Sequence, residues 1–369
     1  MQVTRDGAGV TRYVRELLAS LKDVLHSEER VTAFVQHGAL AVLPPPSDGL
    51  RYQVFGDSLT WRRILTQQFM LPSITRRFDI AHYPDYLTPL WSRGNAYVST
   101  IHDMAYAAPD HFFTASQSVL RRVVNPLTIR RAARVMADSA FTRTEVLRLF
   151  PDVPPSRVSV VYPGIPSLPA PKDSHEVVRR LGLPARFVLS VGTLEPRKNL
   201  HSLLQAFARP ELEQEYVVLV GRQGWGPSIQ RSLGMHRTLA GRVVVVGHIS
   251  DRELGALYAE AAAFAYVSLY EGFGFPVLEA LAAGLPTVAS DIPVLRETTR
   301  GAAVFVDPRS PESIAAGIRS VLDQPALRHH LSRSGAEVAR SYSWRSCAEE
   351  VLAVYRELSQ NRELERQRV

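Results

Sequence analysis

The chain has 369 residues, of which 46% are hydrophobic and 21% are charged, a balance typical of a globular protein and unlike that of a disordered chain. Its single cysteine, Cys347, excludes a disulfide framework and a cysteine-rich zinc site and favours a reducing compartment. The formal net charge is +7, but only three of the 43 basic residues are lysines. We attribute the charge to a general preference for arginine and expect no nucleic-acid partner, because no zinc-finger spacing or RNA-binding aromatic signature accompanies it.

The first half of the chain is predicted to alternate between strands and helices. It begins with a glycine-rich loop, Gly7 to Gly9, that runs into a helix. Residues 142–145 (TRTE) have the spacing of a capping box at a helix start. Strands are expected at residues 30–36, 78–83, 96–102, 134–139 and 157–162. This alternation predicts a parallel sheet covered by helices on both faces.

A proline-rich stretch, residues 163–174, is typical of an interdomain linker, and a second alternating half follows it. Asn199 is expected to cap one helix there, and residues 250–253 (SDRE) to form a capping box. From about Trp344 the sequence predicts a charged amphipathic helix. The strands of this half are expected at residues 187–192, 215–221, 242–248, 263–269 and 286–290.

The domain organisation follows from the length and from this alternation. We expect two Rossmann-like parallel-sheet domains facing a cleft that holds a ligand, over residues 1–168 and 169–345. The helix of residues 346–369 is expected to pack back on the first domain. A doubly wound domain has its first strand directly before the glycine-rich loop. No such segment precedes Gly7, so the first N-terminal strand is expected to be absent.

Two carboxylates flank a glycine turn in the segment YEGFGFPVLEA. Glu271 follows an expected strand, Gly272 and Gly274 allow a tight turn, and a proline then fits the first turn of a helix. The helix start offers free N–H groups and positive dipole charge, and a carboxylate beside it can accept hydrogen bonds from the vicinal diol of a sugar or a ribose. The alternative is that Glu271 and Glu279 only interact favourably with the helix N-terminus.

The segment GTLEPRKN also joins a strand to a helix start. Arg197 and Lys198 stand there beside the positive end of a helix, which is unfavourable unless an anion lies between them. N–H groups, a guanidinium and an ammonium together suit a phosphate or diphosphate. The alternative is a solvated loop in which Glu195 pairs with Arg197.

Two further segments have less specific patterns. His102 and Asp103 end an expected strand at its carboxyl end, where a histidine could be either structural or functional. Gly7 and Gly9 resemble the start of a dinucleotide fingerprint, but Arg12 stands at the third glycine position.

Taken in order, these segments resemble the retaining, metal-independent glycosyltransferases of family 4, which have the two-domain GT-B fold. EGFGFPVLEA resembles the E-x7-E motif of that family, with Glu271 and Glu279 as its glutamates, and GTLEPRKN resembles its phosphate loop. QQFMLP, DIAHYPDYLTP and STIHD resemble the mannosyltransferase-like members, and ADSAFT and YPGI resemble further segments of the donor cleft. The resemblance covers nearly the whole chain, from about Thr4 to the last helix.

The resemblance implies a nucleotide diphosphate sugar as the donor. Lys198 and Arg197 would stabilise the leaving diphosphate, Glu271 would bind the hydroxyls of the donor sugar, and Glu279 would bind the ribose. His102 would contact the donor sugar and help to place the acceptor. The catalytic candidates are His102, Arg197, Lys198 and Glu271. The donor-binding candidates are Gly9, Asp103, Gly192, Thr193, Ile249, Gly272, Phe273, Gly274, Phe275 and Glu279. No cofactor and no metal ligand are expected.

One departure from the family pattern concerns charge. Many relatives have an arginine five positions before the phosphate lysine, where this chain has Thr193. Neutralisation of the diphosphate is therefore expected to rest on Arg197, Lys198 and the helix N-terminus. Breaking a sugar–phosphate bond develops negative charge on the diphosphate, which preorganised cations and N–H groups stabilise.

Other functions stay open at this point. An epimerase or a glycoside hydrolase could use the same scaffold, although a hydrolase needs two carboxylates around the sugar bond and no anion site. A catalytically impaired sugar-nucleotide-binding subunit is the non-enzymatic alternative. The broken glycine fingerprint disfavours a dehydrogenase.

The partners are expected from the resemblance and from the surface chemistry. GDP-mannose is the preferred donor, with UDP-, dTDP- and ADP-sugars as alternatives, and the acceptor is a glycan or a lipid-linked intermediate of polysaccharide biosynthesis. Residues 61–78 combine apolar and basic side chains that suit an anionic membrane face, or else they line the acceptor site. No signal peptide and no apolar run long enough to cross a bilayer are seen. We expect a cytoplasmic enzyme, with contact to the inner face of the membrane.

Overall fold

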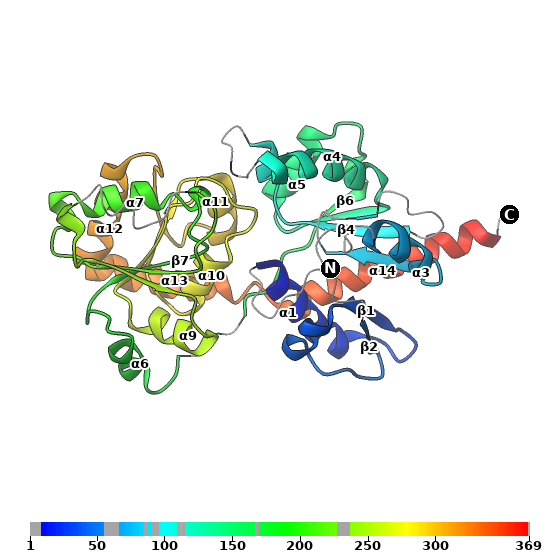
Figure 1. Cartoon of the computed structure of the whole chain (residues 1–369), viewed down its shortest axis with the longest axis horizontal. Coiled ribbons are helices and arrows are strands. Elements are labelled where there is room, and N and C mark those ends of the chain that lie inside the picture. Colours follow the sequence, from blue (N-terminus) through cyan, green and yellow to red (C-terminus); the bar gives the residue numbers. More distant parts are fainter. Residues whose placement is uncertain are drawn as a thin grey trace. The chain divides into compact units, whose positions relative to one another are not determined.

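The computed structural model describes residues 9–54, 66–84, 88, 89, 96–108, 112, 115–166, 168, 170–226 and 237–367. The chain divides into two compact units (Figure 1). The N-terminal unit contains Met1–Gly164 and Tyr342–Val369, and the C-terminal unit contains Ile165–Ser341. The two divisions lie a few residues before the expected boundaries at residues 168 and 345.

The C-terminal unit is built on a six-stranded sheet in the order β12-β11-β10-β7-β8-β9, and all its pairings are parallel. The strands are β7 (Val188–Val191), β8 (Val217–Val220), β9 (Val243–Gly247), β10 (Ala263–Tyr266), β11 (Thr287–Ser290) and β12 (Val304–Val306). The chain order reverses between β7 and β10, which are direct neighbours. In an open doubly wound sheet, ligands bind beyond the carboxyl ends of the strands at this switch point.

Helices cover both faces of this sheet, with the pair α7 and α12 on one side and the pair α6 and α9 on the other (Figure 1). Helix α10 packs on α13. The helices are α6 (Ser174–Arg180), α7 (Leu200–Phe207), α9 (Asp251–Glu260), α10 (Phe275–Ala282), α11 (Pro293–Thr299), α12 (Pro311–Asp323) and α13 (Pro325–Ala339). Strands β8, β10 and β11 are buried along their whole length, which explains why their sequences are apolar without alternation.

The N-terminal unit has a four-stranded parallel sheet in the order β3-β4-β5-β6 and a separate parallel pair, β1 with β2. The strands are β1 (Val31–Val35), β2 (Leu50–Val54), β3 (Ile80–Tyr83), β4 (Ala96–Ile101), β5 (Arg134–Ala137) and β6 (Val158–Val160). The helices are α1 (Gly9–Val24), α3 (Leu71–Thr75), α4 (Ala115–Arg131), α5 (Ala140–Leu149) and α14 (Trp344–Gln367). Helix α14 packs along α1 and reaches β3.

Several short helical elements also occur in the described part of the chain. They are the 3-10 helices η1 (His37–Val42), η3 (Ala105–Ala107), η4 (Pro155–Arg157), η5 (Pro196–Lys198), η6 (Pro210–Leu212) and η7 (Arg237–Leu239), and the π-helical turn η2 (Thr66–Met70). Of these, η5 matters most for function, because it contains both residues of the predicted anion site.

The predicted α/β class with two Rossmann-like parallel-sheet domains is confirmed. Every expected strand is present but shorter at one or both ends, and β2 and β12 are strands that the sequence analysis missed. Strand β2 mixes apolar and polar residues, and β12 is apolar but only 3 residues long, so neither has an apolar run long enough to predict a strand. The structure describes the chain from Gly9 onward, so the expectation about a strand before Gly7 lies outside the described residues.

The predicted helix starts have mixed outcomes. Ser250 and Glu253 form the expected capping box of α9. The expected capping box at residues 142–145 is wrong, because α5 begins earlier: Ser139 is its N-cap, and the Ser139 hydroxyl accepts a hydrogen bond from the N–H of Thr142 at 3.0 Å. Thr142 is thus already inside the helix, and Glu145 pairs with Arg148 instead.

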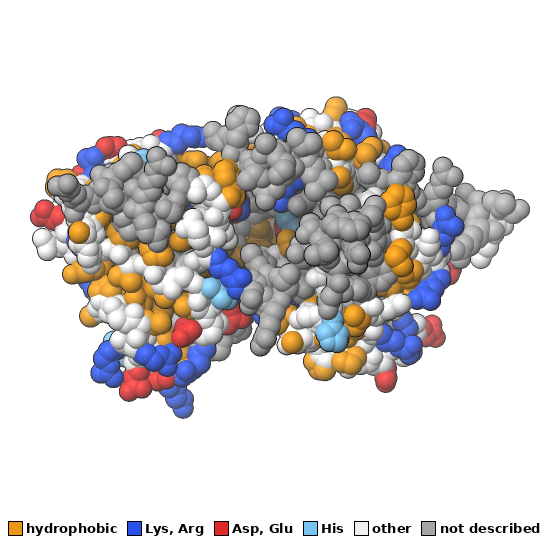
Figure 2. All heavy atoms as spheres, viewed as in Figure 1, with side chains coloured by type: hydrophobic (Ala, Val, Ile, Leu, Met, Phe, Trp, Pro, Cys, Tyr) orange, Lys and Arg blue, Asp and Glu red, His pale blue; other side chains and the backbone are white. Residues whose placement is uncertain are grey.

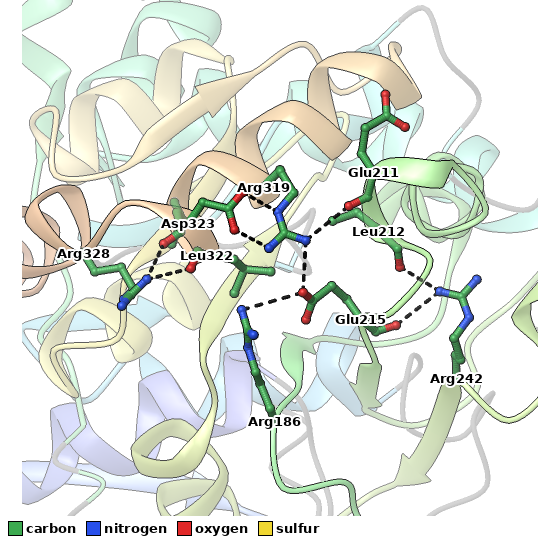
Figure 3. A network of polar contacts seen from close by, with 10 residues as sticks. Arg186, Glu211, Leu212, Glu215, Arg242, Arg319, Leu322, Asp323 and Arg328 are labelled. Atoms are coloured by element: carbon green, nitrogen blue, oxygen red, sulfur yellow. Dashed lines mark hydrogen bonds and ion pairs between the residues drawn. The ribbon is translucent and has the colours of Figure 1, made fainter.

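A polar network ties the amino end of β8 to α12 (Figure 3). Glu215 is 6% exposed, and its Oε1 accepts a hydrogen bond from Nη1 of Arg319 at 3.1 Å and lies 3.6 Å from Nη2 of Arg186. Nη1 of Arg242 donates to the carbonyl oxygens of Leu212 at 2.8 Å and of Glu215 at 3.3 Å. The network lies at the amino ends of the strands, away from the switch-point end where a ligand is expected.

Candidate active site

The anion-binding loop and the first motif glutamate meet at the switch point. Arg197 and Lys198 lie in η5, shortly after β7, and Glu271 lies shortly after β10. Nη1 of Arg197 is 2.9 Å from Oε2 of Glu271, and Nζ of Lys198 is 2.6 Å from Oε1. Each carboxylate oxygen therefore accepts a hydrogen bond from one cation, and three of the four catalytic candidates form one cluster.

The cluster is shielded from water. The side chains of Lys198 and Glu271 are 11% and 8% exposed. Burial by itself would raise the pKa of Glu271, but the charges of Arg197 and Lys198 outweigh burial and lower it to about 2. Burial lowers the pKa of Lys198, and Glu271 acts against this shift. The direct contact at 2.6 Å is that of an ammonium with a carboxylate, so we treat both groups as ionised.

Glycines bring the backbone close to the two cations. Gly192 directly follows β7 and has φ at 153°, and a Cβ on it would lie 3.4 Å from Cε of Lys198. A Cβ on Gly221 would lie only 1.9 Å from the carbonyl oxygen of Gly192. Thr193 is partly buried next to this turn. The loop therefore depends on two strand ends approaching without side chains between them.

The side chain of Asn199 anchors the loop that contains Arg197 and Lys198. It stands at the N-cap position of α7 but has φ at 55°, and its side chain makes no capping hydrogen bond. Instead its Nδ2 donates to the carbonyl oxygens of Val267 at 3.0 Å and of Pro308 at 2.6 Å. The expected N-cap position is confirmed, but the side chain fastens the cation loop to the end of β10 instead of capping the helix. The left-handed conformation is one that asparagine tolerates.

The second motif glutamate lies one helical turn into α10. Glu279 is 4% exposed, and its Oε2 accepts a hydrogen bond from the hydroxyl of Tyr258 at 3.0 Å. The turn before the helix is as predicted: Gly274 has φ at 93°, and Pro276 occupies the first turn. Gly272 and Phe273 are buried in this turn, and the Phe273 ring packs edge-on against that of Phe275 at 5.0 Å.

The remaining catalytic candidate belongs to the N-terminal unit. His102 follows β4, and its Nδ1 lies 2.6 Å from Oδ2 of Asp138, at the end of β5. Its Nε2 lies 3.1 Å from the carbonyl oxygen of Pro84. The ring of Tyr13, from α1, packs edge-on against the imidazole at 4.9 Å. The next candidate, Asp103, accepts a hydrogen bond from the N–H of Ala105 at 3.0 Å, which fits a local turn role.

Two donor-binding candidates belong to other parts of the fold. Gly9 is the first residue of α1 in the N-terminal unit, and Ile249 is a half-buried residue between β9 and α9. Sequence reasoning missed three polar partners of the candidates: Tyr266, Tyr258 and Asp138. Their polar groups gave little signal, because Tyr266 ends an apolar strand and Tyr258 lies inside an amphipathic helix. Asp138 was noted only as part of the segment ADSAFT.

In the part of the chain that the structure describes, His, Cys, Asp and Glu side chains form no group of three or more that could hold a metal ion. Within the same ranges, no helix combines the length and the apolar character needed to cross a bilayer.

A doubly wound domain with paired cations and a carboxylate at its switch point, joined to a second parallel-sheet unit, is the arrangement of a GT-B glycosyltransferase. A family model described as "Glycosyltransferase Family 4" matches residues 7–167, and one described as "Glycosyl transferases group 1" matches residues 173–338. O-antigen chain mannosyltransferase B of Escherichia coli is 30% identical over 75% of this chain and 74% of its own length. An O-antigen chain mannosyltransferase of Salmonella typhimurium is 27% identical over 65% of this chain and 64% of its own length.

Solved structures agree on the fold. A sucrose-phosphate synthase from Thermosynechococcus elongatus has a TM-score of 0.75 at 22% identity, covering 95% of this chain and 94% of its own. Anabaena HepE in complex with UDP and glucose has a TM-score of 0.76 at 18% identity, covering 96% of this chain and 98% of its own. The chain belongs to the family 4 glycosyltransferases of the GT-B fold, and it is a hexosyltransferase.

Proposed function

We propose that this enzyme transfers mannose from GDP-mannose to a glycan or a lipid-linked acceptor, with retention of the anomeric configuration and without a metal ion. The observation that carries the proposal is the contact of Arg197 and Lys198 with Glu271 at the switch point. Mannose is favoured because the relatives from Escherichia coli and Salmonella typhimurium are named mannosyltransferases.

The chemistry of transfer uses the cation pair. The acceptor hydroxyl oxygen forms a bond to the anomeric carbon, the bond from this carbon to the phosphate oxygen breaks, and the hydroxyl proton leaves with the diphosphate. Negative charge then grows on the diphosphate, and fixed cations in a site shielded from water stabilise that charge most in the transition state. Arg197 and Lys198 fill this role in the proposal.

The other candidates have roles in binding. Glu271 accepts hydrogen bonds from the sugar hydroxyls, and Glu279, held by Tyr258, accepts them from the ribose. A carboxylate suits both tasks, because its two oxygens can accept from neighbouring hydroxyls. His102 contacts the donor sugar and helps to place the acceptor.

The first experiment titrates the full chain with GDP, UDP, ADP and dTDP by calorimetry in the presence of EDTA. We expect micromolar binding of GDP, weaker binding of the other three, and a loss of affinity in Lys198→Ala. Lys172→Ala is the matched control, since Lys172 lies in the segment before α6 and should bind GDP as the wild type does. If no nucleotide binds, or if binding requires a divalent cation, the proposed metal-independent site is wrong.

The products of turnover distinguish a transferase from a hydrolase and from an epimerase. With GDP-mannose and a mannose-terminated acceptor, a transferase lengthens the acceptor and releases GDP. A hydrolase would release free mannose without an acceptor, and an epimerase would change the sugar of the donor while leaving the diphosphate bond intact. Either of these products would replace the transferase proposal, whereas GDP binding without any reaction would favour the impaired binding subunit.

A membrane surface is the proposed location of the acceptor. Phe69 and Met70, in η2, are 62% and 55% exposed, and the exposed Arg76 and Arg77 follow closely. Exposed apolar side chains next to arginines suit the boundary of an anionic bilayer. On the face drawn in Figure 2, basic side chains are interspersed with acidic ones over each unit. The membrane proposal therefore rests on the local combination of exposed apolar side chains and arginines and not on the net charge.

Vesicle flotation tests this location. We expect the protein to float with vesicles that contain phosphatidylglycerol at low salt, and Phe69→Ser together with Met70→Ser to reduce the bound fraction several-fold. Val123→Ser is the control, because Val123 is 55% exposed on another helix, α4. Equal flotation of all three proteins, or none with the wild type, would contradict the membrane proposal.

A further inference from the structure

Each glutamate of the E-x7-E motif accepts a hydrogen bond from a buried tyrosine. The hydroxyl of Tyr266, at the end of β10, donates to Oε1 of Glu271 at 2.8 Å. The hydroxyl of Tyr258, in α9, donates to Oε2 of Glu279 at 3.0 Å. Both tyrosines are almost completely buried, at 2% and 1% exposed. Each motif glutamate therefore accepts a hydrogen bond from a tyrosine hydroxyl, and the two tyrosines belong to different elements of the fold.

The hydroxyl of Tyr266 also contacts a cation, whereas the second contact of the Tyr258 hydroxyl is with the carbonyl oxygen of Pro276 at 3.3 Å. Nζ of Lys198 lies 2.7 Å from the Tyr266 hydroxyl oxygen and 2.6 Å from Oε1 of Glu271. The ammonium, the hydroxyl and the carboxylate oxygen thus form a closed triangle of hydrogen bonds. The ammonium also lies 5.0 Å from the centre of the Tyr266 ring, within the range of a cation–π interaction.

The donor and the acceptor of each hydrogen bond in this triangle follow from the chemical nature of the three groups. An ammonium only donates, and an ionised carboxylate only accepts. The Tyr266 hydroxyl must therefore accept from Lys198 and donate its single proton to Glu271. Burial first, and the charge of Glu271 second, raise the pKa of Tyr266 well above its ordinary value. The hydroxyl thus keeps its proton over the whole range in which an enzyme works.

The contacts with Tyr266 and Glu271 limit the orientation of the Lys198 ammonium. The Lys198 ammonium has three N–H groups in a tetrahedral arrangement. The three sides of the triangle are nearly equal, so the oxygens of Tyr266 and Glu271 lie on the same side of the ammonium. Together they restrict rotation about the Cε–Nζ bond and leave an N–H that is directed away from them. Without the Tyr266 hydroxyl, one of these two acceptors is lost and the rotation is less restricted.

We propose that Tyr266 is a positioning residue, which aims the third N–H of Lys198 at the departing diphosphate and keeps the Glu271 carboxylate directed at the sugar. The inference rests on the proposed role of Lys198 in diphosphate departure. A group that only orients a catalytic cation acts on the transition state more than on binding. Removal of the hydroxyl should therefore lower kcat and leave donor binding nearly unchanged.

Tyr258 provides a matched comparison. It donates the same kind of bond to Glu279, which the proposal places at the ribose and away from the reacting bond. Tyr258→Phe should therefore weaken nucleotide binding by a few-fold and change kcat little. Tyr266→Phe keeps the aromatic ring above Lys198 and removes only the hydroxyl. In Tyr266→Phe the glutamate that loses its tyrosine partner is Glu271, and in Tyr258→Phe it is Glu279. A loss of kcat in the first variant and of nucleotide affinity in the second would distinguish positioning from a general loss of structure.

The kinetic test measures kcat and the donor KM together with the affinity for GDP by calorimetry. For Tyr266→Phe we expect kcat to fall by roughly 10- to 100-fold and the GDP affinity to stay within about threefold, as for loss of one preorganised contact in the transition state. An unchanged kcat, or a loss of kcat matched by an equal loss of GDP affinity, would overturn the proposal. A wild type that binds no nucleotide diphosphate would instead overturn the proposed function.

A second readout does not depend on activity. The chain has only three lysines, so protein labelled with ¹⁵N at lysine Nζ gives at most three ammonium signals in an NMR spectrum, and Lys198→Arg identifies one of them. We expect the Lys198 signal to be protected from exchange with water in the wild type. In Tyr266→Phe it should broaden or vanish, while the signals of the other lysines and the Lys198 signal in Tyr258→Phe stay unchanged. A Lys198 signal that is the same with and without the hydroxyl would show that Tyr266 does not orient the ammonium.

Discussion

His102 and Asp138 form a close pair in the N-terminal unit, with Nδ1 of the imidazole 2.6 Å from Oδ2 of the carboxylate. On the other side of the ring, Nε2 lies 3.1 Å from the carbonyl oxygen of Pro84. Carbonyl oxygens and ionised carboxylates only accept hydrogen bonds. Both ring nitrogens therefore face acceptors, and the doubly protonated imidazolium is the form that satisfies both. Asp138 is 2% exposed, so little water competes for its contact with the ring.

We expect Asp138→Asn to lower kcat by about tenfold or more, because a neutral amide of the same shape no longer stabilises the charged ring or fixes its orientation. The affinity for GDP should change little, because Lys198 and Glu271 belong to the C-terminal unit. Steady-state kinetics and calorimetry measure the two quantities. Asp152→Asn is the control, since Asp152 pairs with Arg130 at the surface of the same unit and should not affect turnover. An Asp138→Asn enzyme with wild-type kcat would show that the pair has no role in the reaction.

The acid stability of the C-terminal unit should depend on Glu271. Its pKa in the folded protein is lowered to about 2, from 4.5 for a free glutamate. A lowered pKa in the folded state means that the carboxylate contributes stability above about pH 4.5 and that this contribution declines as the pH falls towards 2. Glu271→Gln should therefore lower the melting temperature most near pH 7, with a smaller difference from the wild type at pH 3. Thermal unfolding at both pH values tests this, and a difference that grows on acidification would contradict it.

Gly221→Ala should destroy the diphosphate site. The new Cβ would lie 1.9 Å from the carbonyl oxygen of Gly192, so the ends of β7 and β8 must separate. We expect a loss of about 2–4 kcal/mol of stability from this overpacking and backbone strain, together with a loss of GDP binding. Gly241→Ala is the control: Gly241 has φ at 77° but nothing within 4 Å of its Cβ position. It should cost about 1 kcal/mol from strain and bind GDP normally.

The network around Glu215 should contribute stability without affecting catalysis. Glu215→Gln leaves the guanidinium groups of Arg319 and Arg186 beside a neutral amide at a buried position. Breaking a buried ion pair in this way typically costs about 3–5 kcal/mol, and we expect the lower half of that range because both arginines are partly exposed. Urea unfolding measures the change. Glu215→Gln should bind GDP as the wild type does, and weakened binding in the folded variant would contradict the separation of the network from the active site.

The sequence predicted much of the local structure correctly, for reasons visible in single residues. Valine-rich runs such as residues 217–220 favour strands. Ser250 and Glu253 have the spacing that closes a capping box. Gly274 provides the left-handed turn before α10. Each of these outcomes depends on a residue and its neighbours within a few positions, which is why pattern alone could identify them. Thr142 shows the limit, because Ser139 competed for the same helix start and lay outside the expected capping box.

The sequence predicted the separate motifs of the candidate site but not which of their residues contact one another. The spacing of Glu271 and Glu279, and the adjacent Arg197 and Lys198, indicated sugar and diphosphate chemistry without any structure. Tyr266 could not be identified, because a tyrosine at the end of an apolar strand has the same pattern whether its hydroxyl is catalytically useful or only buried. Asp138 was part of a segment that resembled the family, yet nothing in the sequence connected it with His102, 36 positions earlier.

The sequence by itself thus determined the alternation of strands and helices and the chemical groups that stand at the strand ends. Only the tertiary structure decided which strand ends adjoin. Lys198 and Glu271 are 73 positions apart in the chain and come within 2.6 Å because β7 and β10 pair at the point where the strand order reverses. Local propensities act over a few residues, whereas strand order is set by the packing of whole helices against a sheet, and this long-range choice brings two ordinary loops together as one charged site.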